Sequence, residues 1–372
     1  MNPGESRTRL GRTLETASLK KNKEAQTEQP VDPTTSHLLS PRGRPARLSL
    51  VIPMYNEAAV IVPLRAAVNS FTRTLRSEVE LILVNDGSSD QTLPLLAEWA
   101  ACDVRVKVLH LSRNFGHQIA ATAGLDHATG DAVVLLDADL QDPLPVIHQM
   151  IDRYCDGYDV VYGRRESRGG ETIYKRFTAW MFYRIMRTLV YRELPPDAGD
   201  FRLISRACLD AVSLMRETHR FLRGMVAWVG FPQAPVAYRR EARVAGSTKY
   251  PLRKMLAFSW IAATSFSTLP LRLSMMLGAA VGLLGIEEGI RAILAHFLGW
   301  YTVPGWTSLI VLVCLIGSAL LMSIGILGEY VAKLYEQSKG RPLYIVARTF
   351  GGRSPISNKA REWDAAVRSN FE

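Results

Sequence analysis

The sequence predicts an α/β fold built on a parallel sheet and extended by helices that lie at a membrane and cross it. Two observations carry this prediction. Between Leu48 and Tyr162, short apolar runs alternate with segments of helical period, which is the pattern of parallel strands joined by helical crossovers. After Met255, apolar stretches long enough for a bilayer follow one another, with basic residues beside them.

Length and composition narrow the class of protein. The 372 residues leave room for one large domain or two ordinary ones. A net charge of +10 is compatible with nucleic acid, anionic lipid or phosphorylated substrates, and the late apolar stretches favour membrane and phosphate over nucleic acid. The four cysteines are scattered without the spacing of zinc ligands or of a disulfide scaffold, which favours a reduced, cytosolic setting.

The first 46 residues are polar and show no sustained period, so we expect a disordered tail without a secretory signal peptide. Arg42, Arg44 and Arg47 could touch anionic lipid, but a solvated tail is favoured.

The elements of the sheet follow in order. We expect strands at 48–52, 79–84, 104–109, 132–136 and 159–162, and helices at 58–76, 91–100, 118–128 and 144–154. Parallel strands end at one edge of a sheet, where such folds bind ligands. The polar loops after these strands are therefore predicted to line one crevice.

Two carboxylates follow the fourth predicted strand. Asp137 and Asp139 are two residues apart, so on an extended chain they share a face. They could hold a hard divalent cation that keeps coordination sites for the oxygens of a nucleotide diphosphate. The alternative is a strand end with two solvated acids and a turn at Asp142-Pro143; the neighbouring loops favour the catalytic interpretation.

The loops after the first and second predicted strands have acceptors suited to a nucleobase. Glu57 and Asp86 could accept hydrogen bonds from base N–H groups, and Gly87 permits close backbone approach. Residues 85–90 also read as Asx-type turns with a helix cap at Asp90, and one loop can serve both roles.

Four of these loops resemble the motif series of glycosyltransferase family 2, in order and in spacing. The motifs are Pro53 to Glu57, Asn85 to Asp90, Arg113 to Gly116 and Asp137 to Pro143. Among members of that family, residues 48–350 are most similar to the membrane-bound polyprenyl-phosphate glycosyltransferases. The resemblance implies a glycosyltransferase A (Rossmann-like) fold for residues 47–250.

The resemblance also implies roles for individual residues. Donor binding falls to Pro53, Tyr55, Glu57, Asp86, Gly87, Asn114 and Asp137, and the Mg²⁺ or Mn²⁺ site to Asp137, Asp139 and Gln141. Contacts to donor or acceptor phosphates fall to Arg164, Arg239, Arg243, Ser247 and Lys249. Asp200, in the run 198–203, matches the catalytic acidic residue of the family and acts with Asp139.

Elementary chemistry limits what Asp200 does. A monoalkyl phosphate, with a second pKa of about 6, is already mostly dianionic at neutral pH. Such a nucleophile hardly needs a base. We therefore expect Asp200 to orient the acceptor or its last proton.

The remaining segments point to a membrane. Residues 173–192 and 251–270 are expected as interfacial helices, although the first could instead pack on the domain core. Residues 271–297 and 306–330 are expected to span the bilayer, and basic flanks place the catalytic domain and the tail 336–372 in the cytosol. Glu287, Glu288 and Arg291 interrupt the first span; they could pair on one helix face, and a re-entrant segment is the alternative.

Together these features predict an inverting, metal-dependent transfer of one sugar from a nucleotide diphosphate donor to a polyprenyl monophosphate. The resemblance suggests UDP-glucose as donor and undecaprenyl phosphate as acceptor, for cell-envelope glycans. The expected location is the cytosolic face of a bacterial inner membrane, and the resemblance suggests a homotetramer. A GDP-mannose or UDP-amino-pentose donor stays open. A processive polysaccharide synthase is disfavoured by two spans and no Gln-x-x-Arg-Trp run, and a non-catalytic nucleotide-binding scaffold by the intact acidic and basic loops.

Overall fold

The computed structural model describes residues 39–165, 198–239, 269–298 and 306–352. The expected interfacial helix at 173–192 lies outside these residues, as does almost all of the one at 251–270. Arg243, Ser247 and Lys249 lie outside them too.

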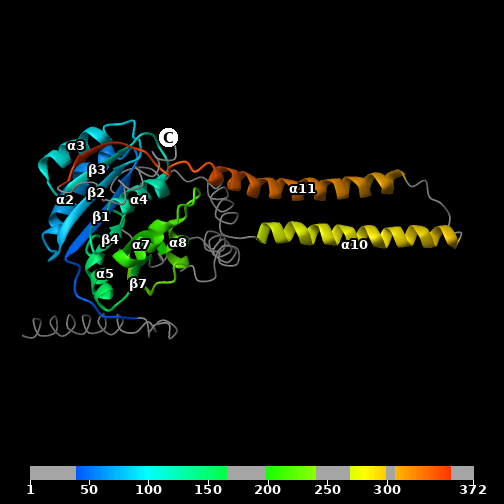
Figure 1. The fold of residues 1–372 in the computed structure, drawn as a ribbon, viewed down its shortest axis with the longest axis horizontal. Helices are drawn as coiled ribbons and strands as arrows, with labels where there is room; N and C mark the ends of the chain where they lie inside the picture. The colour runs from blue at the N-terminus through cyan, green and yellow to red at the C-terminus, as the bar shows by residue number, and fades with distance from the viewer. Residues whose placement is uncertain (1–38, 166–197, 240–268, 299–305, 353–372) are drawn as a thin grey trace, which may run out of the picture. The chain divides into compact units, whose positions relative to one another are not determined.

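Within the described residues, eight strands form one sheet in the order β7-β5-β6-β4-β1-β2-β3-β8 (Figure 1). The strands are β1 (Arg47–Met54), β2 (Glu78–Asn85), β3 (Val106–Leu111), β4 (Ala132–Leu135), β5 (Val160–Arg165), β6 (Ala198–Ser205), β7 (Gln233–Tyr238) and β8 (Val346–Gly351). The neighbours β4, β1, β2 and β3 run parallel, as do β5 and β7. β6 and β8 run antiparallel to their partners.

The five predicted strands are confirmed. β6 and β8, which were not predicted, run antiparallel to their neighbours, so the sheet is mixed and not only parallel. β6 was not predicted, because residues 198–203 were interpreted as the motif that contains Asp200 and not as a strand. Phe201 and Leu203 are fully buried, while Asp200 and Arg202 between them are only 9% and 4% exposed. The run from Asp200 to Leu203 nevertheless alternates polar and apolar residues, so the sequence did carry the period of a strand.

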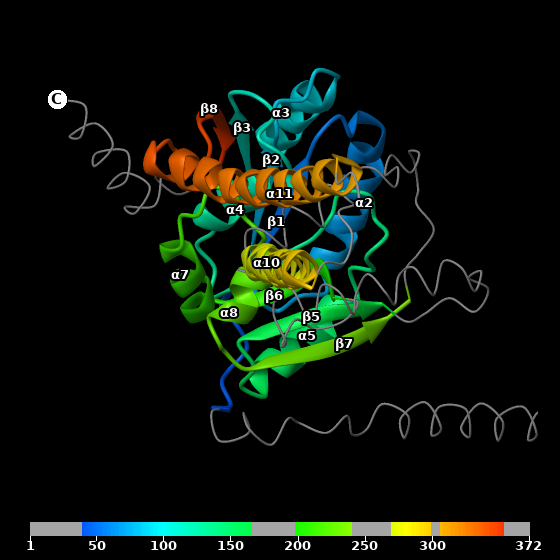
Figure 2. The ribbon, with the colours of Figure 1, turned by 90° about the vertical axis from the view of Figure 1, so that its right-hand side faces the viewer.

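Six helices in the described part of the chain cover the two faces of the sheet. They are α2 (Ala58–Thr72), α3 (Thr92–Cys102), α4 (His117–Asp126), α5 (Val146–Cys155), α7 (Arg206–Leu214) and α8 (Leu222–Trp228). The first four confirm the predicted helices. α4, α7 and α8 share one buried apolar cluster with the sheet, and α2 and α3 lie on the other side (Figure 2).

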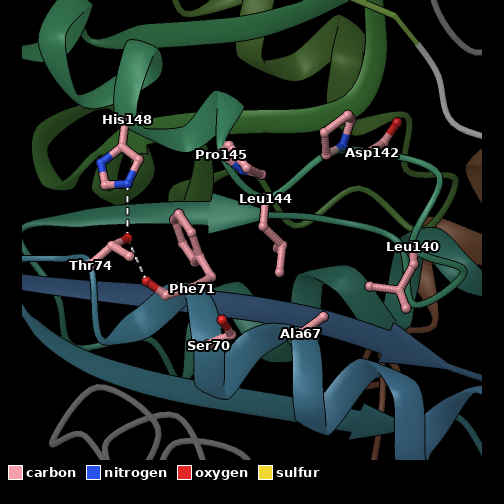
Figure 3. A pocket seen from close by; sticks show the side chains of 10 residues that line it. Ala67, Ser70, Phe71, Thr74, Leu140, Asp142, Leu144, Pro145 and His148 are labelled. Carbon is pink, nitrogen blue, oxygen red and sulfur yellow. Dashed lines mark hydrogen bonds between the residues drawn. The ribbon is translucent and has the colours of Figure 1, made fainter.

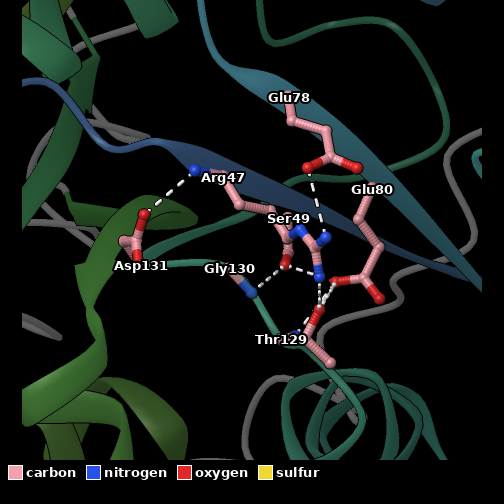
Figure 4. A network of polar contacts seen from close by, with 7 residues as sticks. All are labelled: Arg47, Ser49, Glu78, Glu80, Thr129, Gly130 and Asp131. Carbon is pink, nitrogen blue, oxygen red and sulfur yellow. Dashed lines mark hydrogen bonds and ion pairs between the residues drawn. The ribbon is translucent and has the colours of Figure 1, made fainter. Parts of the chain in front are cut away.

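A polar network closes the amino-terminal edge of the sheet (Figure 4). The Glu80 carboxylate accepts hydrogen bonds from Ser49 Oγ at 2.7 Å and from the backbone N and Oγ1 of Thr129 at 2.9 and 3.0 Å. Beside it, Arg47 forms an ion pair with Glu78 at 3.1 Å. These bonds join β1, β2 and the segment before β4 at the edge opposite the motif loops.

The predicted tail is shorter than expected, because Arg42 and Arg44 are held against the domain. Arg42 lies 2.9 Å from the Asp159 carboxylate and 4.5 Å from the centre of the Tyr154 ring. Arg44 pairs with Asp152 at 2.8 Å. The expectation of a solvated tail is therefore wrong for Arg42, whereas Arg44 is paired but stays exposed.

α10 (Leu269–Phe297) and α11 (Trp306–Ser338) lie side by side (Figure 1). Each contains a stretch that is long and apolar enough to cross a membrane, Leu271–Arg291 and Leu315–Ser338, and length and composition are the support for that role. α10 continues through Glu287 and Arg291 without a break, and α11 ends at Ser338 rather than at Tyr330. Large apolar side chains along both helices are exposed.

Candidate active site

The pairing of β4 with β6 brings two predicted acids together. Leu135 lies opposite Arg202 in an antiparallel ladder. The residue two places beyond Leu135 is Asp137, and the residue two places before Arg202 is Asp200, so continuing the register sets the two carboxylates side by side. Both lie close to the same nitrogen, Nε2 of His117, at 3.6 Å from Asp137 and 3.5 Å from Asp200.

Asp200 is surrounded by donors. Arg223 Nε donates to Oδ1 at 2.7 Å, while Gln118 Nε2 lies 3.4 Å and His117 Nε2 3.5 Å from Oδ2. Burial opposes the charged form, but the His117 hydrogen bond and the Arg223 charge outweigh it and hold the pKa of Asp200 well below its usual range. Asp200 is therefore an ionised carboxylate and a weak base.

Asp137 is in the opposite electrostatic situation. Burial raises its pKa, and the carboxylates of Asp200, Asp142 and Asp139 raise it further, against the influence of His117. His117 is 42% exposed, and the two acids beside it outweigh its partial burial and raise its pKa. Like charges crowded at one point favour a bound cation or an imidazolium there.

The loop after β4 has an unusual backbone. Leu140 has a φ of 56°, a left-handed conformation that is uncommon for a residue with a side chain. Oδ1 of Asp139 accepts a hydrogen bond from the backbone N–H of Gln141 at 3.1 Å, and Asp142 accepts one from the hydroxyl of Tyr238. In the described residues, no group of three His, Cys, Asp or Glu side chains is arranged to hold a metal ion by itself.

The predicted nucleobase residue Asp86 is bound to the next motif loop. It is 2% exposed, and its two oxygens accept the backbone N–H groups of Phe115 at 2.7 Å and Gly116 at 2.9 Å. Gly87, with φ +65°, lies so close to that loop that a Cβ would come within 2.6 Å of the Asn114 backbone nitrogen. The loop must therefore have glycine at this position.

Pro53 lies near the end of β1, and the loop that follows it, with Tyr55 and Glu57, is bonded to residues 89 and 92. The backbone N–H of Glu57 donates to Thr92 Oγ1 at 3.0 Å, and Oδ1 of Asn56 accepts from the backbone N–H of Ser89 at 2.9 Å. Tyr55 is 46% exposed and Pro53 is buried.

Residues 113–118 connect the two groups of predicted residues. Phe115 and Gly116 bind Asp86, and the next two residues, His117 and Gln118, contact Asp200. The structure thus brings Asp86, Gly87 and Asn114 together on one side and Asp137 and Asp200 on the other.

Two of the predicted phosphate-binding arginines are described. Arg164 lies on β5 opposite Ala198 of β6, two residues from Asp200, and Arg239 follows β7 and is exposed. Binding of phosphate by either residue stays a prediction.

A cavity of about 510 Å³ lies beside the acidic loop (Figure 3). It opens between α2 and residues 140–148, and its lining includes Phe71, Leu140 and Leu144, with Thr74 bound to His148 at 2.9 Å. None of the predicted site residues lines it. The cavity adjoins the site only through Asp142, one of the carboxylates near Asp137.

Three site residues escaped the sequence analysis: His117, Gln118 and Arg223. The first two directly follow the motif that ends at Gly116, so their position in the chain was a usable signal. Arg223 lies on α8, far from the recognised motifs, and only the fold brings it to Asp200.

Comparison with known proteins identifies the family. The sequence profile of "Glycosyl transferase family 2" matches residues 49–212. YkcC of Bacillus subtilis (strain 168), named as a glycosyltransferase, is 42% identical over 316 residues, 85% of this chain and 97% of that protein. The "Prophage bactoprenol glucosyl transferase homolog" of Escherichia coli (strain K12) is 37% identical over 302 residues, 81% of this chain and 99% of that protein.

The solved structure of the mannosyltransferase PcManGT from Pyrobaculum calidifontis, in complex with GDP-Man and Mn²⁺, is more distant. It is 16% identical, with 80% of this chain and 91% of that chain covered and a TM-score of 0.40. The relatives of 37–42% identity over nearly their whole length are decisive. The chain belongs to glycosyl transferase family 2 and is a glycosyltransferase.

Proposed function

We propose that this protein transfers a single sugar from a nucleotide sugar to polyprenyl phosphate, with UDP-glucose and undecaprenyl phosphate as the first choice. The observation that carries the proposal is the meeting of Asp137, Asp200 and Arg223 around His117 at the carboxyl edge of the sheet. Support for the acceptor comes from relatives in Escherichia coli and Shigella flexneri whose names include bactoprenol glucosyl transferase, both 37% identical.

The residues fit a hard divalent cation, Mg²⁺ or Mn²⁺. Asp137 and Asp139 offer carboxylate oxygens, which such ions prefer, and the crowding that raises the pKa of Asp137 is what a cation would relieve. Donor diphosphate oxygens and water would complete the coordination, with Gln141 as the assisting residue proposed from the resemblance. When bound, the cation supplies charge stabilisation for the leaving nucleoside diphosphate.

The side chains around Asp200 position the acceptor. A carboxylate with a strongly lowered pKa removes protons poorly, so we assign Asp200 the orientation of the acceptor phosphate or its last proton. Arg223, Gln118 and His117 hold Asp200, and Arg223 and a protonated His117 add positive charge where a phosphate dianion must approach. Attack of that phosphate oxygen on the anomeric carbon, opposite the leaving diphosphate, gives inversion in one step.

The membrane arrangement is part of the proposal. Basic residues flank the apolar stretches at Arg272, Lys333, Lys339 and Arg341, which favours both ends of the α10–α11 pair on the cytosolic side of a bacterial inner membrane. The active site would then face cytosolic nucleotide sugars, and the lipid-embedded acceptor would reach it from the bilayer. We also propose a homotetramer, and the family resemblance is its only support.

A screen of nucleotide sugars tests the proposal. Purified full-length protein in detergent is given undecaprenyl phosphate, Mg²⁺ or Mn²⁺, and radiolabelled UDP-glucose, GDP-mannose or a UDP-amino-pentose in turn. We expect a single-sugar lipid from UDP-glucose, with the anomeric configuration inverted.

Other outcomes identify the alternatives. A single-sugar lipid from one of the other donors changes the sugar and keeps the reaction, whereas a polymer would indicate a processive synthase. Nucleotide binding without transfer at saturating metal and lipid would indicate a non-catalytic scaffold and contradict the proposal.

A further inference from the structure

The end of α11 is bonded to a loop of the catalytic domain. Oε1 of Gln337 accepts two hydrogen bonds from Thr218, one from the backbone N–H and one from Oγ1, both at 2.8 Å. Nε2 of Gln337 donates to the backbone oxygen of Arg216 at 3.1 Å, and Glu336 pairs with His219 at 2.8 Å. Residues 216–219 are therefore fixed along their length by one turn of α11.

The same loop is held from a second side. Oδ2 of Asp126, at the end of α4, accepts from Arg216 Nη1 at 2.7 Å and from the hydroxyl of Tyr344 at 2.9 Å. Tyr344 belongs to the segment that leads from α11 to β8, and β8 pairs with β3 at the edge of the sheet. The chain after the membrane helices thus returns to the catalytic domain and closes over the loop.

Residues 216–219 lead directly into the reaction centre. Three residues after His219 the chain enters α8, where the backbone N–H of Leu222 donates to Gln118 Oε1 at 3.0 Å. The next residue, Arg223, donates to Asp200 at 2.7 Å, and Gln118 turns its amide nitrogen to the same carboxylate. A displacement of the loop therefore moves Arg223 and loosens the Leu222 bond that holds Gln118 beside Asp200.

From this chain of contacts we propose that Gln337 is a positioning residue for glycosyl transfer: from the end of α11 it fixes the 216–219 loop and thereby holds Arg223 against Asp200. The inference rests on the proposed function, since it assigns a role in that reaction. It means that the helix that anchors the enzyme in the membrane also sets the geometry of its reaction centre.

Matched variants at neighbouring positions test this role. Gln337→Ala removes the three bonds to the loop, and Ser338→Ala is the control, because the Ser338 hydroxyl bonds to Tyr335 within α11. We expect kcat to fall about fivefold in Gln337→Ala, as for a loss of hydrogen bonds of ordinary strength, with the KM for the sugar donor unchanged. Thr218→Val should show part of this loss of kcat, and Thr218→Ser, which keeps the hydroxyl, should retain the wild-type kcat.

Coupling to Arg223 separates positioning from a general structural effect. If Gln337 acts through Arg223, the double variant Gln337→Ala/Arg223→Ala should be no slower than Arg223→Ala alone. The proposal would be overturned if the loss of kcat in the double variant were the product of the two single losses, or if Gln337→Ala were as active as Ser338→Ala.

Hydrogen exchange tests the contact chain without relying on activity. Gln337→Ala should speed exchange of the Leu222 amide in full-length protein, and Ser338→Ala should not. Unchanged exchange in Gln337→Ala overturns the positioning role even if the enzyme is active. A wild-type protein that transfers no sugar would refute the proposed function instead, and the exchange result would still decide the contact chain.

Discussion

The two ends of the sheet are both polar, but their charges are arranged in opposite ways. At the amino-terminal edge, Glu80 accepts three hydrogen bonds and Arg47 pairs with Glu78 (Figure 4). At the carboxyl edge, burial raises the pKa of Asp137, and three other carboxylates raise it further. The first edge stabilises the fold, and the second holds unfavourable charge that a cation and a phosphorylated substrate can compensate.

The largest effect expected from this contrast is at Asp139. Asp139→Asn keeps an oxygen for the Gln141 amide but removes a charge from the carboxyl edge. We expect transfer to fall by about 1,000-fold, since electrostatic groups of this kind contribute several powers of ten, while the melting temperature stays the same or rises. The assay is radiolabelled sugar transfer to lipid, with surface residue Asp156→Asn as control. Full activity would contradict the metal assignment.

Glycine substitutions test the donor side of the carboxyl edge. In Gly87→Ala the new Cβ would lie 2.4 Å from the Arg113 carbonyl carbon, whereas at Gly116 nothing lies within 4 Å and only the positive φ opposes a side chain. We expect Gly87→Ala to weaken nucleotide binding about 100-fold and Gly116→Ala less, because a backbone clash adds to strain. Calorimetric titration with UDP measures the affinity of each variant. Equal affinities would contradict the prediction, because they would show that close contact between residues 85–90 and 113–116 is not needed for nucleotide binding.

At the amino edge the expected effect is on stability alone. Glu80→Ala removes three hydrogen-bond acceptor contacts and should lower the free energy of unfolding by about 2 kcal/mol. Its kcat should equal that of wild type. Thermal unfolding of Glu80→Ala and of the exposed control Glu98→Ala, together with their transfer rates, checks this. If kcat in Glu80→Ala fell by more than the loss of folded protein explains, the amino edge would also serve catalysis. That result would contradict the contrast between the two edges.

The smallest expected effect is a pH dependence of stability. The pKa of Asp200 is lowered, so its interactions stabilise the fold above its ordinary value of 3.8 and are lost as pH falls through the lower folded value. The pKa of His117 is raised, so its contribution is full below 6.5 and is lost as pH rises through the higher folded value. The difference in melting temperature between wild type and His117→Gln should therefore be larger at about pH 5.5 than at about pH 8.5. A difference that grows with pH would contradict the pairing.

Local patterns in the sequence predicted the sheet and most of the site. Asp137, Asp86 and Gly87 were found because each follows a buried strand within a few residues. β6 was missed although its residues alternate in polarity, because the run was interpreted only as the motif that contains Asp200. Arg223 was missed because only tertiary packing brings α8 to β6. The apolar stretches predicted as spans form α10 and α11, whose large apolar side chains are exposed. β8 was not predicted, because it forms only by pairing with β3, which is distant in the sequence.

Binding of Mn²⁺ in the presence of UDP is the most direct test of the carboxyl edge as the reaction centre. Electron paramagnetic resonance of the full-length protein measures free and bound Mn²⁺ for wild type, Asp139→Asn and Glu80→Ala. We predict tight binding by wild type and Glu80→Ala and at least about a tenfold weaker affinity in Asp139→Asn, as for loss of a charged ligand. Equal affinity in Asp139→Asn and wild type would contradict the assignment of the carboxyl edge.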